Sequence, residues 1–167
     1  NHTHSKLSFL PISHVFENTI NYYFQSVGVG VYYAENMGTI ADNLKEVQPH
    51  VFISVPRLLE RTYDKIIQKG RDLSGIKKQI FFWAVNLGMK YEIPQGNGFF
   101  YNLALKVADR LIFSKWREAL GGKVRIVGCG GASLQSRLER IFWAAGIKII
   151  NMYGLTETSP IITINGT

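Results

Sequence analysis

Residues 123–150, KVRIVGCGGASLQSRLERIFWAAGIKII, predict a strand, a helix and a second strand in direct succession. The first strand is expected over residues 123–128 and the helix over residues 135–145. Gly146 stands where a left-handed residue commonly ends a helix, and residues 147–150 are expected to form the second strand. A strand–helix–strand order is typical of a parallel sheet whose faces are covered by helices.

The same alternation extends through the rest of the chain. Residues 50–55 form a continuous apolar run, which suits a strand buried on both faces. Further short strands are expected over residues 6–10, 28–33 and 161–164. Helices are predicted over residues 15–24, over residues 39–47, and from Pro56 to about Gln68. Gly70 is expected to stop the last of these helices.

The longest helical stretch covers residues 74–120 and has a break at residues 94–98, which read PQGNG. The pair Gly121–Gly122 is expected to end it. Trp83 and Trp116 lie within this stretch, and we expect both to cover the core. The sequence therefore predicts one α/β domain, with a mainly parallel sheet covered by helices and a helical insertion.

The composition limits the class of protein. Of the 167 residues, 46% are hydrophobic and 19% are charged, which excludes a disordered chain. Cys129 is the one cysteine, so no intramolecular disulfide can form. The formal net charge of +7 attracts phosphate groups, but acidic residues interrupt the basic ones within residues 57–78, which favours a solvated helix face over nucleic-acid binding. No apolar run approaches the ~20 residues that span a bilayer, and no amphipathic anchor is evident.

Two loops follow predicted strands, at the carboxyl ends where ligands bind in open α/β sheets. The first loop, residues 128–133, reads GCGGAS. Glycines let a backbone approach a flat ligand or a phosphate because no Cβ intrudes. A tight turn from strand to helix explains these residues equally well, so both readings stay open for this loop.

The second loop, residues 151–158, reads NMYGLTET and places four groups suited to one nucleotide within a few residues. Tyr153 offers a ring on which a base can stack, and the amide of Asn151 can pair with an adenine edge. Thr156 offers a hydroxyl donor for a phosphate oxygen, and Glu157 offers a carboxylate for Mg²⁺. The alternative is a plain turn with Glu157 in solvent, which four matched groups make less favourable.

Residues 151–160, NMYGLTETSP, resemble the Tyr-Gly-x-Thr-Glu signature of the AMP-forming adenylating enzymes, and Gly-Gly-Ala at residues 130–132 lies at the expected distance upstream. Residues 10–17, LPISHVFE, resemble the Leu-Pro-x-x-His-x-Phe-Glu segment of the long-chain fatty acid–CoA ligases, the acyl-CoA synthetases. Residues 49–57, PHVFISVPR, and the helical insertion are similar to that branch as well. The resemblance covers essentially the whole chain.

The resemblance implies a two-step reaction that uses ATP, Mg²⁺ and CoA. A fatty acid carboxylate attacks the α-phosphorus of ATP to give an acyl-adenylate and pyrophosphate, and the CoA thiol then displaces AMP. Thr156 would bind a phosphate, Glu157 would hold Mg²⁺, and His14 would lie near the carboxylate and the phosphates. The alternative for His14 is a histidine at a helix start that the backbone satisfies. The nucleotide contacts implied by the resemblance are Asn151, Tyr153, Gly154, Gly130, Gly131 and Ala132.

The resemblance further implies that residues 1–167 are the central part of the large AMP-binding domain. The phosphate loop of the family is expected before residue 1, and the ribose-binding Asp and the C-terminal domain are expected after residue 167. We therefore expect these residues alone to be inactive and to form a homo-oligomer through apolar faces. The expected location is the cytoplasm, with peripheral membrane contact left open. A nucleotide-binding or surface-docking basic α/β module without catalysis is the alternative.

Overall fold

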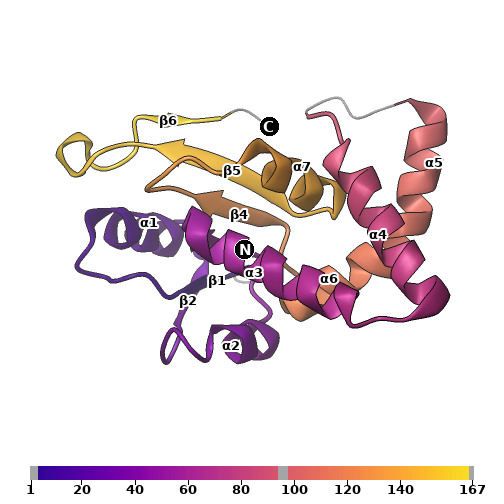
Figure 1. Cartoon of the computed structure of the whole chain (residues 1–167). Helices are drawn as coiled ribbons and strands as arrows, with labels where there is room; N and C mark the ends of the chain where they lie inside the picture. The colour runs from indigo at the N-terminus through magenta and orange to yellow at the C-terminus, as the bar shows by residue number, and fades with distance from the viewer. Residues whose placement is uncertain (1–3, 94–97, 166–167) are drawn as a thin grey trace.

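A six-stranded sheet forms the centre of the molecule (Figure 1), and the computed structural model describes residues 4–93 and 98–165. The strands are β1 (Ser5–Ser8), β2 (Gly30–Tyr33), β3 (Val51–Ser54), β4 (Ile126–Cys129), β5 (Lys148–Tyr153) and β6 (Thr163–Ile164). They lie in the order β2-β1-β3-β4-β5-β6. β1 to β5 pair in parallel, and β6 runs antiparallel to β5. The predicted α/β class with a mainly parallel sheet is confirmed.

Helices connect the parallel strands and cover the sheet (Figure 1). They are α1 (Val15–Ser26), α2 (Ile40–Val47), α3 (Pro56–Arg71), α4 (Gly75–Met89), α5 (Phe99–Ala108), α6 (Ser114–Ala119) and α7 (Ser136–Ala144). A π-helical segment, Asp109–Phe113, joins α5 directly to α6, and the sequence pattern did not indicate it. α4, α5 and α6 form the predicted helical insertion between β3 and β4, on the right in Figure 1.

One face of the sheet carries the main hydrophobic core. Leu7, Phe52, Val127 and Ile149 are register partners across β1, β3, β4 and β5, and none is more than 3% exposed. Side chains from the covering helices complete this core, among them Leu59, Phe81, Trp116, Leu138 and Phe142. Because side chains alternate along a strand, the residues between these positions face the other side of the sheet, where α1 lies.

Trp116 meets the expectation of a core residue, whereas Trp83 does not. The Trp116 side chain is 4% exposed, and its ring centroid lies 5.4 Å from that of Phe113 in an edge-to-face arrangement. Trp83 is 42% exposed on α4, so the prediction that it covers the core is wrong. Helical spacing cannot tell which side of a long apolar helix finds a partner, because that depends on the neighbouring elements.

Two predicted boundaries are also corrected. α3 continues through Gly70 to Arg71, because the buried Gly70 allows the Phe81 ring of α4 to approach: an added Cβ would lie 2.1 Å from Phe81 Cε1. β5 runs on to Tyr153, since Asn151 pairs with β4 and Tyr153 pairs with Thr163 of β6. Asn151 and Tyr153 therefore belong to a strand rather than to a loop.

The structure also bears on the predicted helix ends, on the predicted break at residues 94–98 and on membrane-spanning segments. Gly121 and Gly122 follow α6 with φ values of +93° and +82°, and Gly146 follows α7 with φ +75°, so all three end helices as predicted. The predicted break at residues 94–98 lies outside the described residues except for Gly98, the N-cap of α5. In the part of the chain that the structure describes, no helix has the length and apolar character needed to cross a bilayer.

Candidate functional site

A cavity of about 410 Å³ opens at the carboxyl ends of β3, β4 and β5. Its polar and glycine lining comes from the start of α1, the loop after β4 and the loop after β5: His14, Glu17, Gly130, Gly131, Gly154, Thr156 and Glu157. The structure thus brings together six of the nine residues predicted for the site, from segments that are far apart in the sequence. This is the sheet edge where ligands bind in open α/β folds.

Close packing requires glycine at one position beside the cavity and favours it at another. An added Cβ on Gly154 would lie 1.6 Å from the carbonyl oxygen of Pro160, so the chain can return past this residue only without a side chain. An added Cβ on Gly130 would lie 3.0 Å from Cζ of Phe16, a tight contact that brings the loop after β4 against α1. The glycine loops therefore serve as tight turns and as cavity walls at once.

Thr156 and Glu157 lie on a single 3₁₀ turn, Thr156–Thr158, at the cavity edge. The Thr158 hydroxyl holds this turn, since its Oγ1 accepts from the Leu155 N–H at 2.9 Å and donates to the Leu155 carbonyl at 2.9 Å. Both Thr156 and Glu157 are exposed, so a ligand can reach their side chains. The sequence motif contains Thr158 but did not indicate that it shapes the turn.

His14 is the N-cap of α1 and also lines the cavity. Its Nδ1 accepts a hydrogen bond from the Phe16 N–H at 3.3 Å. A neutral imidazole whose Nδ1 accepts carries its proton on Nε2, so the opposite ring edge is the hydrogen-bond donor. The helix-capping role left open for His14 is therefore present, and it orients the ring within the cavity wall.

A buried polar cluster that includes the cavity-lining Glu17 lies at the base of this wall and was not predicted. Glu17 is 1% exposed, and its Oε1 accepts from Lys6 Nζ at 2.7 Å and from Ser8 Oγ at 2.5 Å. Asn21 completes the cluster through hydrogen bonds with Lys6 and Ser8. Within the described residues, Glu17 Oε2 has no hydrogen-bond partner. The cluster ties β1 to α1 and so fixes the helix whose first residues line the cavity.

Burial lowers the pKa of the Lys6 ammonium, and the hydrogen bond and charge of Glu17 oppose that shift. The only sequence signal for this pair is a lysine inside a predicted short strand, eleven residues before the acidic residue Glu17 of the next predicted helix. The position of Lys6 in a strand does not reveal which residue of a covering helix will contact its side chain.

Three predicted site residues lie outside the cavity lining. Asn151 donates from Nδ2 to Glu139 Oε1 on α7 at 3.0 Å, which leaves its side-chain oxygen as an acceptor. Tyr153 is 62% exposed, although its neighbour Gly154 lines the cavity. Ala132 is exposed beside Gly131. Their positions border the cavity rather than build its wall.

A comparison with models of protein families identifies the family of this chain. The family model described as AMP-binding enzyme matches residues 1–167. The chain belongs to the AMP-binding enzyme family. The resemblance drawn from the two loops and from residues 10–17 is thereby confirmed at the level of the family.

Curated relatives of this AMP-binding chain include acyl-CoA synthetases of plants and animals. It is 35% identical over 160 residues to the peroxisomal long chain acyl-CoA synthetase 6 of Arabidopsis thaliana, covering 94% of this chain and 22% of that protein. It is 31% identical over 165 residues to a long-chain-fatty-acid–CoA ligase of Homo sapiens, covering 95% of this chain and 25% of that protein. The chain thus spans less than a third of the length of these relatives.

Solved structures share the fold of this AMP-binding chain. The N-terminal domain of FACL13 from Mycobacterium tuberculosis superimposes with a TM-score of 0.59 at 16% identity, covering 96% of this chain and 29% of that one. The A domain of the carboxylic acid reductase from Segniliparus rugosus, solved with AMP and a carboxylic acid, gives a TM-score of 0.59 at 21% identity, covering 94% and 21%. At these identities the likeness establishes the fold alone.

The carboxylate and hydroxyl groups at the cavity edge are chemically compatible with a Mg²⁺ ion that is also held by phosphates. Among the described residues no group of three or more His, Cys, Asp or Glu side chains is placed to hold a metal ion. Mg²⁺ in nucleotide sites commonly takes one or two carboxylates, with phosphates and waters as its other ligands. The exposed carboxylate of Glu157 beside the Thr156 hydroxyl fits that pattern.

Proposed function

We propose that the chain is part of a long-chain fatty acid–CoA ligase and that its cavity holds the reacting ends of the fatty acid and ATP. The observation that supports this most is the convergence of His14, Gly130, Gly131, Gly154, Thr156 and Glu157 on one cavity at the strand ends. The fatty acid carboxylate would attack the α-phosphorus of ATP with pyrophosphate as the leaving group, and the thiol of CoA, after losing its proton, would displace AMP from the acyl-adenylate.

Each residue of the cavity would have a role that follows from its side-chain chemistry. The Thr156 hydroxyl and the Nε2–H of His14 donate hydrogen bonds to phosphate and carboxylate oxygens, which holds the reacting phosphorus in line. Glu157 would hold Mg²⁺, which neutralises charge on the departing pyrophosphate. Gly130 and Gly131 would form a wall that a flat ligand can approach, with Ala132 at its border.

The adenine would bind at the border of the cavity. Tyr153 is exposed and free to stack on a base, and Asn151 keeps its side-chain oxygen as an acceptor for the adenine amino group. Glu139 sets that orientation, because an amide that donates from Nδ2 to a carboxylate presents Oδ1 to the ligand.

A titration of the chain with a non-hydrolysable acyl-adenylate mimic, palmitoyl-sulfamoyl adenosine, tests this proposal. Because base stacking on an aromatic ring contributes about 1–3 kcal/mol, Tyr153→Ala should weaken binding at least about fivefold. Tyr22→Ala is the matched control, since Tyr22 is 69% exposed on α1 and should leave affinity unchanged. Absence of measurable binding by the chain, or equal affinity for the two variants, would reject the nucleotide site.

The same titration at rising salt separates this function from a surface-docking basic module. Binding to a phosphate backbone falls steeply with salt, whereas stacking and short hydrogen bonds in a cavity are screened much less. We also expect residues 1–167 alone not to release pyrophosphate from palmitate, ATP and Mg²⁺, because the reaction needs several groups held together and the chain spans 22% of its relative. Turnover well above background would contradict that expectation.

A further inference from the structure

A second cavity, with a volume of about 230 Å³, lies on the face of the sheet opposite α1. It opens between residues 40–45 of α2 and residues 58–69 of α3, and we call it the α2–α3 cleft. Its floor consists of core side chains, since Phe52, Val127 and Trp116 line it and none of them is more than 4% exposed. No residue of the candidate site lines it, so the α2–α3 cleft is a separate cavity.

The walls of the α2–α3 cleft offer an aliphatic surface and few hydrogen bonds. Leu44 of α2 and Leu59 of α3 line it and are buried. Among the described residues that line it, Thr62 carries the one hydroxyl group, and that hydroxyl already donates to the Leu58 carbonyl at 2.8 Å. Met37 lies exposed at the opening, and its flexible thioether can adapt to a ligand. Such walls suit an unbranched aliphatic chain.

Three lysines mark the mouth of the α2–α3 cleft, because they line it and are also exposed. They are Lys45 on α2 and Lys65 and Lys69 on α3. Within residues 4–93 and 98–165, none of the three forms an ion pair, and no carboxylate lines the cleft. Lys65 and Lys69 are four residues apart on one helix, a spacing at which like charges repel. An anion at the mouth would relieve that repulsion.

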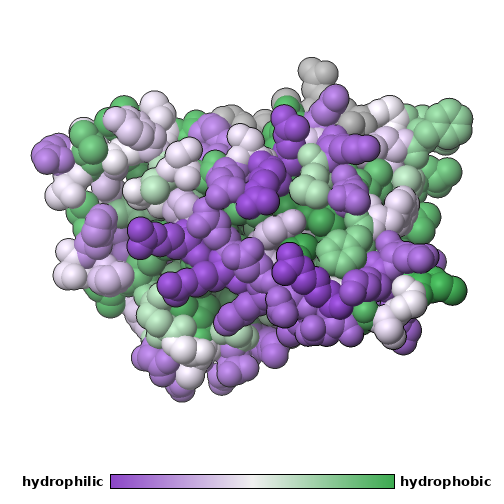
Figure 2. All heavy atoms as spheres, viewed as in Figure 1, coloured by the Kyte–Doolittle hydropathy of each residue, from purple (hydrophilic) through white to green (hydrophobic). Residues whose placement is uncertain are grey.

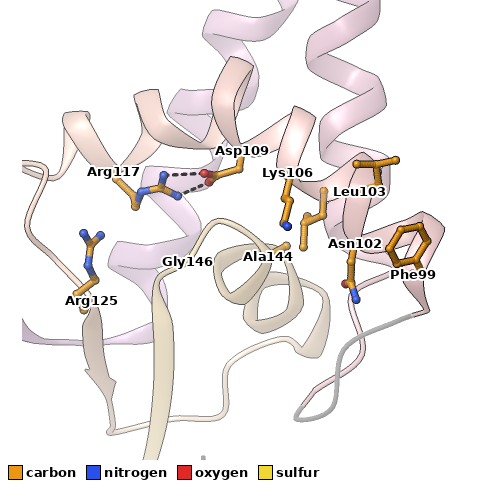
Figure 3. Close-up of a pocket in the computed structure, with 10 residues that line it drawn as sticks. Phe99, Asn102, Leu103, Lys106, Asp109, Arg117, Arg125, Ala144 and Gly146 are labelled. Carbon is orange, nitrogen blue, oxygen red and sulfur yellow. Dashed lines mark hydrogen bonds and ion pairs between the residues drawn. The ribbon is translucent and has the colours of Figure 1, made fainter.

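The distribution of charge distinguishes the α2–α3 cleft from the rest of the surface. Figure 2 shows hydrophilic side chains across the front of the molecule, where Figure 1 places α3, and hydrophobic side chains below them toward α2. The larger hollow beside α5, of about 860 Å³, has a different lining (Figure 3), since it includes Asp109 in an ion pair with Arg117. In the α2–α3 cleft, every charge on the lining is positive.

We propose that the α2–α3 cleft binds a single aliphatic chain that ends in an anionic group. The chain lies among the apolar side chains between α2 and α3, and the anion lies at the mouth, where Lys65 and Lys69 donate hydrogen bonds to it and Lys45 attracts it from α2. Burial of methylene groups drives binding, and charge fixes the direction of the chain. A free fatty acid and a monoalkyl phosphate share this chemistry. The site does not depend on the ligase reaction proposed above, because the two cavities share no residue.

The size and charge of the α2–α3 cleft favour a small amphiphile over a protein partner. A helix with its side chains is about 10–12 Å wide, which exceeds what a cavity of about 230 Å³ can enclose. A second copy of the chain carries a formal net charge of +7, so three lysines at the mouth would repel it. A narrow chain with a negative end meets both constraints.

Quenching of Trp116 fluorescence by ω-bromoundecanoate tests the proposal, because Trp116 lines the cleft and bromine quenches tryptophan on contact. Trp83→Phe combined with Trp143→Phe leaves Trp116 as the one tryptophan of the chain. We expect saturable quenching below the concentration at which the fatty acid forms micelles. Lys65→Gln combined with Lys69→Gln should weaken binding at least about fivefold. Ala41→Phe, which obstructs the mouth without changing its charge, should weaken binding by about the same factor.

Thermal unfolding of the unaltered chain provides a second measurement. Decanoate should raise the Tm, because a ligand that binds only the folded state stabilises it. Decanoate should bind about fourfold more tightly than nonanoate, since each buried methylene contributes about that factor, and decanol should bind more weakly than decanoate because it lacks the charge. Tighter binding of decanoate than of decyl phosphate would assign a fatty acid to the cleft, and the reverse order would assign a monoalkyl phosphate.

Matched controls make the test specific to the α2–α3 cleft. Lys77→Gln combined with Lys115→Gln removes two exposed charges outside the cleft and should leave quenching unchanged. Palmitoyl-sulfamoyl adenosine should not displace the brominated fatty acid, so this result is independent of the nucleotide site. Thermal unfolding of every variant shows whether the fold persists. The proposal is overturned if quenching does not saturate and decanoate leaves the Tm unchanged, if the control variant loses as much binding, or if the adenylate mimic displaces the brominated fatty acid.

Discussion

At the scale of single residues, the buried cluster around Glu17 shows how a charged group supports the candidate site. Lys6 and Glu17 are 0% and 1% exposed, and each is the other's counter-ion. Removing one partner leaves a buried charge without compensation, which is far more costly than replacing both by apolar groups. The pair therefore gives the first turn of α1, with His14 before it, a fixed position against β1.

Glu17→Ala is expected to lower the free energy of unfolding by about 3–5 kcal/mol, because the Lys6 ammonium then lies buried without a carboxylate. The double variant Lys6→Met, Glu17→Leu should recover most of that loss. Urea denaturation followed by circular dichroism measures both. Glu46→Ala, at an exposed position on α2, is the control. If Glu17→Ala and Glu46→Ala were equally stable, the cluster would not support the fold.

The buried thiol of Cys129 makes stability depend on alkaline pH. Burial first, and the charges of Glu139 and Glu60 second, raise its pKa from 9.0 to about 12. A group whose pKa is raised on folding contributes stability that is complete below its unfolded pKa and is lost as pH rises toward its folded pKa. Between pH 9 and pH 10 we expect the free energy of unfolding to fall by about 1 kcal/mol from this group alone.

Urea titrations at pH 8, 9 and 10 measure this fall, and Cys129→Ala is expected to remove it. Because the thiol is 1% exposed and remains protonated, iodoacetamide should alkylate the folded chain slowly at pH 8 and the unfolded chain rapidly. Equal alkylation rates in water and in urea would contradict the burial of Cys129.

At the scale of elements, the turn from β5 into β6 depends on a close backbone approach. Gly154→Ala would place a Cβ 1.6 Å from the carbonyl oxygen of Pro160, so the loop that carries Thr156 and Glu157 must move. We expect a loss of about 1–3 kcal/mol in unfolding free energy and much weaker binding of the acyl-adenylate mimic. Thermal unfolding and the titration described above measure both effects.

Gly98→Ala is the control for that substitution, since an added Cβ at Gly98 meets nothing within 4 Å. It should lower the unfolding free energy by no more than about 1 kcal/mol, because Ala is a poorer N-cap than Gly, and it should leave mimic binding intact. A Gly154→Ala chain that behaves like Gly98→Ala would mean that the close approach to Pro160 does not shape the site.

At the scale of the whole molecule, β2 is an edge strand of the sheet and lies open. Tyr32 and Tyr33 on it are 52% and 53% exposed. Unpaired edges with aromatic side chains favour pairing with another chain. We expect concentration-dependent self-association through this edge. Tyr32→Lys should abolish it in sedimentation velocity, and Tyr22→Lys on α1 should not. A monomer at all concentrations would reject the predicted homo-oligomer.

How far the sequence predicts this molecule is clearest at the candidate site. The order of strands and helices follows from local patterns, because apolar runs, Gly146 and Gly121–Gly122 act on their own neighbourhood. The motifs at residues 128–133 and 151–158 indicate a nucleotide site, because their glycine, aromatic, hydroxyl and carboxylate groups are suited to binding a base and phosphates. Exact strand ends escaped prediction, since the extension of β5 depends on pairing with β4 and β6.

The amino-acid sequence by itself determined the α/β class, the family signature and six of the residues that line the cavity, because periodicity and chemical type are properties of the chain. Only the tertiary structure decided that Lys6 pairs with Glu17, that Glu139 orients Asn151 and that α5 turns Phe99 and Phe100 outward. These facts depend on which elements meet in space, and contacts between residues distant along the chain leave no local pattern to read.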